Sequence, residues 1–511
     1  MIFVIGSGPA GVACAAALLE RNCAVTMLDV GIMLEEEKQA LLNNNQVDKN
    51  STVSESLKQQ QLDSKNPLKL VYNSDFPYAE VTNYFTLKMG KGISCFPSFA
   101  KGGLSNAWGA FVEFYQTNQF DGWPISVAAL TPSYKKIADL LNPAEVYFAG
   151  NTQSNFYYLS KQAKKIFNCW QVHQEALSTA GFSFKHATLA VNFSNGSFES
   201  CRYCGLCQHG CPISLIYSSA LTLNALQKNA RFRYIENIIV EQFSESLEHI
   251  VIHAVHRLTK EKLSFTGTQV FSACGAIIST ALFLKSAQLF NQKITFKDSS
   301  HFILPCFMRS QVKNVTAEKL HTLCQLVLKL NNPVIAPNPM HFQLYTYMDY
   351  YQKQLKNMLK WSYRLFAPLI NFFLGRLVVI QGFVDAKDGH QFTMEMQENG
   401  VIKLMPKYNP NVDLIMRRLI KVMKKHSSEL GWYPVSWMLK VSNIGKSFHY
   451  GGSMPMRLQP DEMETDIFGK PPQFRRLHIV DAAIFPNIAA GSITPTIMAN
   501  AFRIGKECDL L

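Results

Sequence analysis

The sequence has 511 residues, of which 47% are hydrophobic and 17% are charged. A chain of this length is too long for one hydrophobic core, and its globular composition argues against long-range disorder. Its formal net charge is +13, from 50 basic and 37 acidic residues, but no run of like charge resembles a nucleic-acid-binding arm. We therefore expect no nucleic-acid partner, and we interpret the charge as a preference for an anionic substrate or membrane surface.

The first 30 residues predict a strand, a glycine turn, a helix and a second strand. Gly6, Gly8 and Gly11 form G-x-G-x-x-G between the first strand and the helix. In this motif the first glycine permits a tight turn, the second lets backbone approach a pyrophosphate, and the third allows close helix–strand packing. Asp29 ends the second strand, where a carboxylate binds a ribose hydroxyl, and the helix N-terminus offers amide donors to phosphates. The motif predicts a dinucleotide site without deciding between FAD and NAD.

Polar loops, helices and strands then alternate along the chain. Residues 41–66 are rich in Asn, Gln, Ser and Lys, which predicts a long surface excursion. Residues 124–143 are predicted to carry a helix, "LTPSYKKIADLLN", with Pro132 at a position that a helix start tolerates. Alternating apolar residues predict strands over 233–243, 249–258 and 268–275, and an apolar stretch predicts a helix over 276–290.

The second half of the chain predicts an antiparallel sheet and then a return to the first domain. Turn signals separate the later of the strand candidates, which lie at 301–310, 341–349, 376–386 and 390–397. A further strand and helix follow at 477–485 and 492–505. We therefore expect an α/β fold, in which a Rossmann-like dinucleotide-binding domain built from both chain ends holds an inserted α+β domain.

No uninterrupted apolar stretch is long enough to span a bilayer. The nearest one, residues 359–384, is interrupted by Lys360, Arg364 and Arg376. We expect a buried helix that runs into a core strand there. The alternative is a helix that lies in a membrane interface, which would give the protein a peripheral membrane contact.

Four of the 12 cysteines, Cys201, Cys204, Cys207 and Cys211, have the spacing C-x2-C-x2-C-x3-C and are followed by Pro212. This spacing is typical of an iron–sulfur cluster, either 4Fe-4S or 3Fe-4S. Zinc favours two CxxC pairs separated by a longer stretch, so it fits less well, and structural thiols are the remaining alternative. Whether Cys211 is a ligand stays open, because in two-cluster ferredoxins the fourth cysteine of this motif serves the other cluster.

The other cysteines are dispersed, which is typical of small core residues in a reducing compartment. The N-terminus lacks the pattern of a signal peptide. We therefore expect a cytoplasmic protein, with the membrane-associated alternative given above.

Several further segments occur in the order in which the glucose–methanol–choline oxidoreductases carry them. They are "KGGLSNAWGA" at 101–110, "GWPISVAALTPSY" at 122–134, "SACGAIISTALFLKSA" at 272–287, "FHYGGSMPM" at 448–456 and "LHIVDAAIFPNIAAGSITPTIMANAFRIG" at 477–505. With the N-terminal motif, they make the sequence resemble this family of FAD enzymes, which oxidise alcohols and sugars, and most closely its bacterial sugar and polyol dehydrogenases. The resemblance is thin over 41–90 and 310–435.

The resemblance implies an FAD-binding domain and an inserted substrate domain. The FAD-binding domain would be formed by 1–110, by 196–290 with the cysteine loop 201–212, and by 440–511. The substrate domain would be formed by 111–195 and 291–439.

The resemblance also implies a set of residues that hold FAD. Gly6, Gly8, Gly11 and Asp29 would hold its ADP half, and Gly102, Gly103 and Ser105 would cradle the pyrophosphate and flavin. Asp481 would bind the ribityl chain, and the backbone from Thr494 to Thr496 would face the pyrimidine edge, where a helix N-terminus stabilises reduced, anionic flavin. Ala107 stands where some relatives link a histidine covalently to the flavin, so we expect non-covalent FAD.

His449 is the expected catalytic base, because it matches the histidine of the family pattern H-x-x-G-T-x-x-M, here "HYGGSMPM". A histidine is suited to accept the hydroxyl proton of an alcohol while hydride leaves its carbon for flavin N5. Ser492 stands where the family places Asn or His as the partner of this base. Serine can hold a substrate oxygen but cannot be protonated as histidine can; Asn487 or Asn500 are alternative partners.

The sequence thus predicts an FAD-dependent dehydrogenase that oxidises a CH–OH group of a sugar, polyol or other alcohol. Some relatives pass electrons outward through an iron–sulfur cluster, which implies an acceptor such as a quinone or a cytochrome. Two alternatives stay open: a flavin reductase or desaturase acting on C–C bonds, and a catalytically decayed flavoprotein that serves as an electron-transfer or interaction partner.

Overall fold

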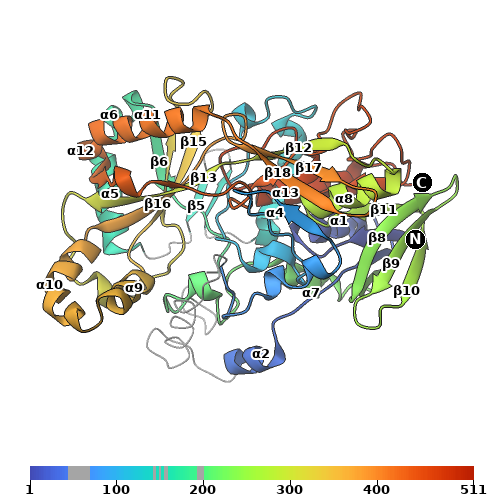
Figure 1. Ribbon diagram of the computed structural model, residues 1–511, viewed down its shortest axis with the longest axis horizontal. Helices are drawn as coiled ribbons and strands as arrows, with labels where there is room; N and C mark the ends of the chain where they lie inside the picture. Colours follow the sequence, from blue (N-terminus) through green and yellow to red (C-terminus); the bar gives the residue numbers. More distant parts are fainter. Residues whose placement is uncertain (44–68, 142–144, 149–150, 155–158, 193–200) are drawn as a thin grey trace.

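The structure is a computed structural model that describes residues 1–43, 69–141, 145–148, 151–154, 159–192 and 201–511. It is a mixed α/β structure with several sheets, and both chain termini lie at one end of it (Figure 1). The predicted polar excursion at 41–66 lies almost entirely outside the described residues, and α2 (Glu36–Asn43) leads into it.

Five of the described strands form a parallel sheet close to the two termini. In spatial order they are β22 (Leu477–Ile479), β11 (Gln269–Ser272), β1 (Ile2–Ile5), β2 (Val25–Leu28) and β7 (Phe232–Ile235). The first four of these are wholly buried, as expected for short apolar strands of a parallel sheet covered by helices.

Helices from distant parts of the chain pack together beside this sheet. They are α1 (Pro9–Glu20), α4 (Val127–Leu141), α7 (Ser219–Leu226) and α13 (Thr494–Glu507). Helix α8 (Ala276–Ala287), which follows β11, packs instead on β8 (Ile238–Glu245) and β17 (Gln391–Met396). Helix α13 contacts both α1 and α4, and α1 also contacts α7. Gly505 makes the α1–α13 contact close, because a Cβ there would lie 2.8 Å from the carbonyl oxygen of Cys14.

The predicted strand at 233–243 is two strands in different sheets. The chain turns at Asn237, whose φ is 62°, so β7 joins the parallel sheet while β8 (Ile238–Glu245) joins β9 (Ile250–His256) and β10 (Lys262–Gly267) in an antiparallel sheet. This sheet packs on α8 through β8.

A mixed sheet connects both halves of the chain. Its described strands are, in order, β21 (Tyr450–Gly451), β12 (Lys293–Asp298), β17 (Gln391–Met396), β18 (Ile402–Lys407) and β3 (Leu87–Met89). The inward side chains of β12 and β17, among them Phe296 and Phe392, belong to the same apolar core as the parallel sheet.

The largest described sheet is antiparallel, as predicted for the second half of the chain. Its strands are, in order, β19 (Trp432–Pro434), β13 (His301–Met308), β16 (Leu377–Phe383), β15 (Met340–Tyr345), β14 (Leu326–Leu330) and β6 (Phe182–His186), with β20 (Lys440–Val441) beside β13. A separate two-stranded hairpin is formed by β4 (Glu145–Phe148) and β5 (Asn151–Ser154).

Side chains alternate between the two faces of this largest sheet. One face packs its apolar residues into a second core with α5 (Lys161–Val172), α6 (Gln174–Thr179), α11 (Asn411–Lys425) and α12 (Ser427–Leu430). The opposite face looks toward the first core, to which Val327 and Tyr345 belong. The sheet therefore separates a helical layer from the part of the molecule that carries the glycine motif (Figure 1).

Two sequence predictions fail locally. Helix α4 begins at Val127, so Pro132 lies inside the helix and not at its start. Residues 359–384 do end in the core strand β16, but the preceding helices are not buried: α9 (Asp349–Leu359) has no fully buried residue, and α10 (Tyr363–Leu374) buries Ile370 and Leu374. Within the described ranges, no helix is both long enough and apolar enough to cross a membrane.

Candidate active site

The residues predicted to hold a cofactor gather at the carboxyl edge of the parallel sheet. Gly6 follows β1, Asp29 follows β2, Gly275 follows β11 and Asp481 follows β22. In this sheet β2 lies on one side of β1, whereas β11 and then β22 lie on the other side of β1. Such a reversal of strand order is where open α/β sheets bind their ligands.

The glycine motif leaves a bare stretch of backbone at the N-terminus of α1. A Cβ on Gly11 would lie 1.9 Å from the carbonyl oxygen of Gly6, whereas nothing lies within 4 Å of a Cβ placed on Gly8. A Cβ on Gly103 would lie 3.2 Å from the Cα of Gly8, so the second predicted loop crosses directly over the first. No side chain caps α1, so its first amides stay available, and the residues fit a pyrophosphate.

Asp29 is buried and bound by two hydroxyl groups. The hydroxyls of Ser7 and Tyr234 both donate to its Oδ2, the latter at 3.0 Å. The amide of Gly102 donates to Ser7 Oγ at 2.8 Å, which ties the second loop to the first. Burial raises the pKa of Asp29 to about 6. Sequence reasoning found Asp29 but missed Ser7 and Tyr234, although Ser7 lies inside the glycine motif.

Gly102 and Gly103 both have positive φ, at 86° and 58°, and lead into the short 3-10 helix Gly103–Asn106. Ser105 is committed to this turn: its hydroxyl donates to the carbonyl of Gly102 at 2.5 Å and accepts from the amide of Ser219 at 2.8 Å. It therefore holds the loop in shape and joins it to α7.

Asp481 is likewise bound from two sides. It accepts hydrogen bonds from the Ser279 hydroxyl at 2.5 Å and from the Ala483 amide at 2.9 Å, and burial raises its pKa to about 6. Ser279 lies on α8, whose N-cap, Gly275, has a φ of 82° and would have nothing within 4 Å of a Cβ placed on it.

Helix α13 begins at Thr494, and no side chain caps it. Its first backbone amides therefore have no capping partner, as in α1. Thr496 lies at its start and shares a hydrogen bond of 3.1 Å with the hydroxyl of Tyr134 on α4. The helix therefore presents the N-terminus that the sequence predicted near Pro495.

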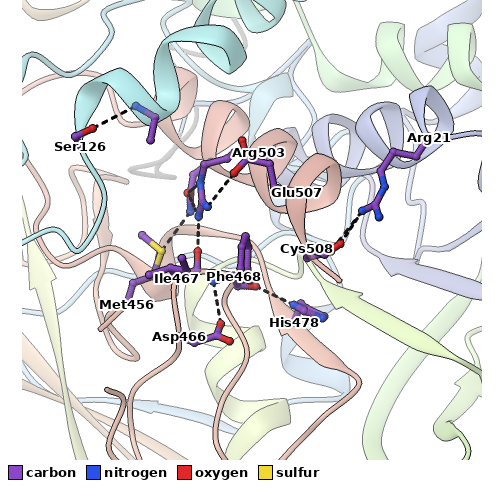
Figure 2. Close-up of polar contacts among 12 residues, drawn as sticks. Arg21, Ser126, Met456, Asp466, Ile467, Phe468, His478, Arg503, Glu507 and Cys508 are labelled. Carbon is purple, nitrogen blue, oxygen red and sulfur yellow. Dashed lines mark hydrogen bonds and ion pairs between the residues drawn. The ribbon is translucent and has the colours of Figure 1, made fainter. Parts of the chain in front are cut away.

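The buried Arg503 guanidinium holds the other half of α13 (Figure 2). It donates to the carbonyl of Ile467 and, at 3.0 and 3.1 Å, to Oδ1 of Asn500. Arg21, which follows α1, donates to the backbone carbonyls of Gly505 and Cys508. The Oδ1 atom of Asn500, one of the alternative partners expected for His449, is thus occupied by the Arg503 guanidinium.

His449 immediately precedes β21, and its imidazole stacks on Phe383 at the end of β16, with ring centroids 5.0 Å apart. Strand register places Phe383 between His341 of β15 and His301 of β13. Burial, aided by the nearby His301, lowers the pKa of His449 to about 3. Its Nδ1 is buried and has no hydrogen-bond partner in the described part of the chain. His449 is thus a neutral imidazole with a ring nitrogen free to bind a ligand.

A buried ionic cluster, which sequence reasoning missed, lies on the same face of the largest sheet. Glu113 forms ion pairs with Lys185 at 2.7 Å and Lys329 at 2.9 Å, and its other oxygen lies 3.5 Å from Nδ1 of His341. Burial alone would raise the pKa of the Glu113 carboxyl, but the two ammonium groups together hold it well below its usual range. We define Glu113, Lys185, Lys329 and His341 as the Glu113 cluster.

Ser492 is buried, and its neighbour Gly491 abuts the Glu113 cluster, because a Cβ on Gly491 would lie 3.2 Å from Glu113 Oε2. No hydrogen bond between the described side chains joins Ser492 to His449. Asn487 donates weakly to Asp385, at 3.3 and 3.4 Å, and its Oδ1 is buried without a partner among the described residues. Asn487 therefore remains an alternative partner for the base.

The four cysteines lie in one loop, close enough for their thiols to interact electrostatically. Burial, and then the neighbouring thiols, raise the pKa of Cys201 to about 11 and of Cys207 to about 12. Nearby, the Lys69 ammonium donates to the carbonyl of Trp108 at 3.0 Å, and burial lowers its pKa to about 8. This places the loop beside the segment that follows Ser105.

The described thiols of this loop are not arranged as a metal site. Within the residues that the structure describes, no group of three or more His, Cys, Asp or Glu side chains is placed to hold a metal ion. Backbone amides donate instead to two of the sulfurs, those of Cys201 and Cys211, at 3.5 and 3.3 Å. The predicted iron–sulfur cluster on Cys201, Cys204, Cys207 and Cys211 is therefore not supported by the structure.

Compared with known proteins, the chain matches no family model and no curated protein in sequence. Its structure is similar to the crystal structure of pyridoxine 4-oxidase from Mesorbium loti, with a TM-score of 0.60, 12% sequence identity, and coverage of 99% of this chain and 98% of that chain. A likeness at this identity shows the fold alone. The chain has a mixed α/β fold that is consistent with the flavoprotein fold of the glucose–methanol–choline oxidoreductases, whose motifs its sequence resembles.

Proposed function

We propose that this protein is an FAD-dependent oxidoreductase that oxidises a CH–OH group of an alcohol, sugar or polyol and holds its FAD without a covalent bond. The observation that carries the proposal is the bare backbone at Gly8, Gly103 and the uncapped start of α1, at the switch point of the parallel sheet. Asp29 and Asp481 lie at the same edge and would bind the ribose and the ribityl chain. The full-length fold similarity to an oxidase supports this proposal.

Bound FAD would supply the hydride acceptor for the alcohol carbon. His449 would accept the hydroxyl proton at a ring nitrogen, since its imidazole is neutral at physiological pH. Phe383 fixes the plane of that ring by stacking on it. Ser492 would orient the substrate oxygen, with the Asn487 amide as the alternative.

The surroundings of this site suit a hydroxylated substrate. The Glu113 cluster offers charged hydrogen-bond donors and an acceptor from one face of the largest sheet, and the side chains of Lys185 and Lys329 remain 31% and 30% exposed. Polyols and sugars carry several hydroxyl groups, and each needs a polar partner when it leaves water. We propose that the substrate domain, formed by 111–195 and 291–439, presents this cluster to the FAD-binding domain, formed by 1–110, 196–290 and 440–511.

The test is flavin reduction by substrate in the absence of oxygen. The purified protein should contain FAD that acid or heat releases, and a panel of sugars, polyols and alcohols should include one that bleaches the flavin absorbance. The variant His449→Gln should retain FAD, and its rate of flavin bleaching should fall by a factor of about 100 to 10,000. The variant His253→Gln, on the distant strand β9, should bleach at the wild-type rate. Normal bleaching by His449→Gln would overturn the assignment of the base.

Two results would favour other functions. Bound FAD that no alcohol reduces would favour a decayed flavoprotein, in line with the serine at 492. Reduction by an activated alkene or a saturated acyl compound, with no response to alcohols, would favour a reductase or desaturase.

We further propose that the enzyme works as a dehydrogenase with a quinone or cytochrome acceptor. Turnover with a quinone analogue, without formation of hydrogen peroxide in air, is the expected result, and stoichiometric peroxide would identify an oxidase.

The predicted iron–sulfur cluster is tested independently. Iron analysis and absorbance spectra of anaerobically purified wild-type and Cys204→Ser protein should agree if no cluster forms, and iron that is lost in Cys204→Ser would restore the prediction.

A further inference from the structure

The helical hairpin formed by α9, the 3-10 turn Lys360–Ser362 and α10 exposes large apolar side chains along its outer side. Met358 is 78% exposed, Trp361 is 80% exposed and Leu365 is 69% exposed. Leu369 and Phe372 continue this row toward the end of α10, with Phe366 and Phe373 beside them. The spacing of Leu365, Leu369 and Phe372 places them on one side of α10, and Trp361 lies four residues before Leu365 in the preceding 3-10 turn. We call these seven residues the outer stripe.

Apart from Phe373, whose ring centroid lies 5.7 Å from that of Phe307 on β13, the outer stripe is separate from the side of the hairpin that stabilises the fold. The inner side packs Leu355, Leu359, Ile370 and Leu374 against the core under the largest sheet. A hydrogen bond of 3.1 Å from the Gln352 amide to the Tyr363 hydroxyl joins α9 to α10. The core is therefore complete without the outer stripe. A helix that is apolar on both sides is typical of a buried or a membrane-embedded segment.

The α9–α10 hairpin stands at the end of the molecule opposite the two termini (Figure 1). Contiguous exposed apolar patches of this kind are rare on soluble monomers unless they bind something. Amphipathic helices of this composition, with Trp, Leu and Phe on one side and cations around them, lie in the headgroup region of a membrane.

The charges around the outer stripe indicate which kind of partner can cover it. Residues 349–376 contain five basic residues, namely Lys353, Lys356, Lys360, Arg364 and Arg376, and one acidic residue, Asp349. Lys356, Lys360 and Arg364 are exposed, and the Arg376 guanidinium lies 4.6 Å from the centre of the Phe372 ring. A second copy of the chain placed symmetrically on this surface would bring like charges together, whereas an anionic bilayer complements them.

We propose that the α9–α10 hairpin docks the protein on an anionic lipid bilayer, with the outer stripe in the headgroup region and Lys356, Lys360 and Arg364 against lipid phosphates and carboxylates. The hairpin lies on the membrane and does not cross it, because the 12 residues of α10 extend only about 18 Å against a hydrocarbon thickness of about 30 Å. This surface is independent of the proposed flavin site, since none of its residues belongs to that site.

Vesicle flotation of the full-length protein tests the docking. Vesicles of phosphatidylcholine with phosphatidylserine should carry the wild-type protein upward, and vesicles of phosphatidylcholine alone should carry much less. The fluorescence of Trp361 measures insertion into the headgroup region directly, because it should shift to shorter wavelength on binding and should be quenched by brominated lipid. The double variant Leu365→Ser, Leu369→Ser should lose flotation. Its matched control, Leu247→Ser, removes a leucine that is 78% exposed in the β8–β9 turn and should float like the wild type.

The electrostatic part has its own variants. Lys356→Gln, Lys360→Gln and Arg364→Gln should each weaken binding to the anionic vesicles by roughly fivefold, and raised salt should weaken it further. Lys228→Gln, Lys262→Gln and Lys293→Gln, which neutralise exposed lysines elsewhere, should not. Flavin content and thermal stability of all variants should stay at the wild-type level, which separates lost docking from lost folding.

Three results would overturn the proposal. Equal flotation with neutral and anionic vesicles would contradict the role of the basic residues. Flotation unaffected by the double variant Leu365→Ser, Leu369→Ser would contradict the role of the outer stripe. A wild-type dimer that this double variant converts to a monomer, without any vesicle binding, would show that a second copy covers the outer stripe.

Discussion

The imidazole of His449 stacks on the phenyl ring of Phe383, with ring centroids 5.0 Å apart and planes inclined by 23°. The two residues are 66 positions apart in the sequence (449 minus 383). His449 immediately precedes β21, and its backbone carbonyl accepts a hydrogen bond from the amide of Ser299. Phe383, the last residue of β16, pairs with the nearby His301. The stack orients a neutral imidazole whose Nδ1 has no partner among the described residues. Phe383 is thus a positioning residue for the proposed base.

Phe383→Leu should lower the rate of flavin reduction by about tenfold while FAD content stays unchanged, because the imidazole loses its fixed plane. Stopped-flow measurements of flavin bleaching give this rate directly. Phe342→Leu is the matched control, since Phe342 is a buried phenylalanine on the opposite face of the same sheet. It should lower stability and leave the rate constant unchanged, and equal effects of both variants would contradict the positioning role.

Gly8→Ala and Gly11→Ala should separate cofactor binding from folding. Nothing lies within 4 Å of a Cβ on Gly8, so Gly8→Ala should fold normally and bind FAD about tenfold more weakly or worse, because the methyl group occupies the approach to the pyrophosphate. Gly11→Ala places a Cβ 1.9 Å from the Gly6 oxygen and should destabilise the apoprotein by about 1–3 kcal/mol.

Thermal melts of the apoproteins and titration with FAD distinguish the two glycine variants. Wild-type FAD affinity in Gly8→Ala would count against the proposed cradle.

Glu113→Gln should destabilise the protein by about 1–3 kcal/mol, because Lys185 and Lys329 would lose their shared anion. The value lies at the low end for a buried ion pair since both lysine side chains are partly exposed. The apparent KM of the identified substrate should rise if the cluster contacts it. Denaturant unfolding and steady-state kinetics measure the two effects, with Glu464→Gln, which breaks the more exposed pair with Arg457, as a variant expected to be near neutral.

Arg503→Met should cost about 3 kcal/mol of unfolding free energy, because the carbonyl of Ile467 and Oδ1 of Asn500 would lose their buried donor. Lys506→Met, one turn away, breaks an exposed ion pair with Glu20 and should cost less than about 1 kcal/mol. Chemical denaturation followed by tryptophan fluorescence gives both values. Similar costs for the two variants would mean that Arg503 does not hold α13.

The contribution of the buried, neutral histidines to the unfolding free energy should fall as the pH drops below the ordinary histidine pKa of about 6.5. Burial lowers the pKa of His478 to about 4 and that of His321 and His341 to about 3. Between these values and about 6.5 each of these three histidines binds more protons in the unfolded chain than in the folded chain, so its protonation favours unfolding. Each such histidine contributes a slope of about 1.4 kcal/mol per pH unit in this window. Plots of unfolding free energy against pH for the wild type and for His478→Asn should differ by one such slope in this window. Parallel plots would contradict the lowered pKa of His478.

The sequence by itself determined the elements whose signals are local. The glycine motif fixed the first strand, the turn and α1, because each glycine meets a steric demand within a few residues of chain or at the adjoining strand. Alternation identified β13, β15, β16 and β17, and the end of the chain predicted the strand and helix that became β22 and α13. The cysteine spacing, by contrast, predicted a cluster for which the described sulfurs are not arranged.

Only the tertiary structure decided which distant residues meet. The register of β6, β14 and β15 brings Lys185, Lys329 and His341 to Glu113, and alternation within one strand carries no information about its neighbours' register. The same limit hid the split at Asn237, which sends two adjacent strands into different sheets. Residues 359–374 read as a buried helix because they are apolar, but burial depends on what packs against a surface. Here the largest sheet covers one side of the hairpin and leaves the outer stripe to water or a bilayer.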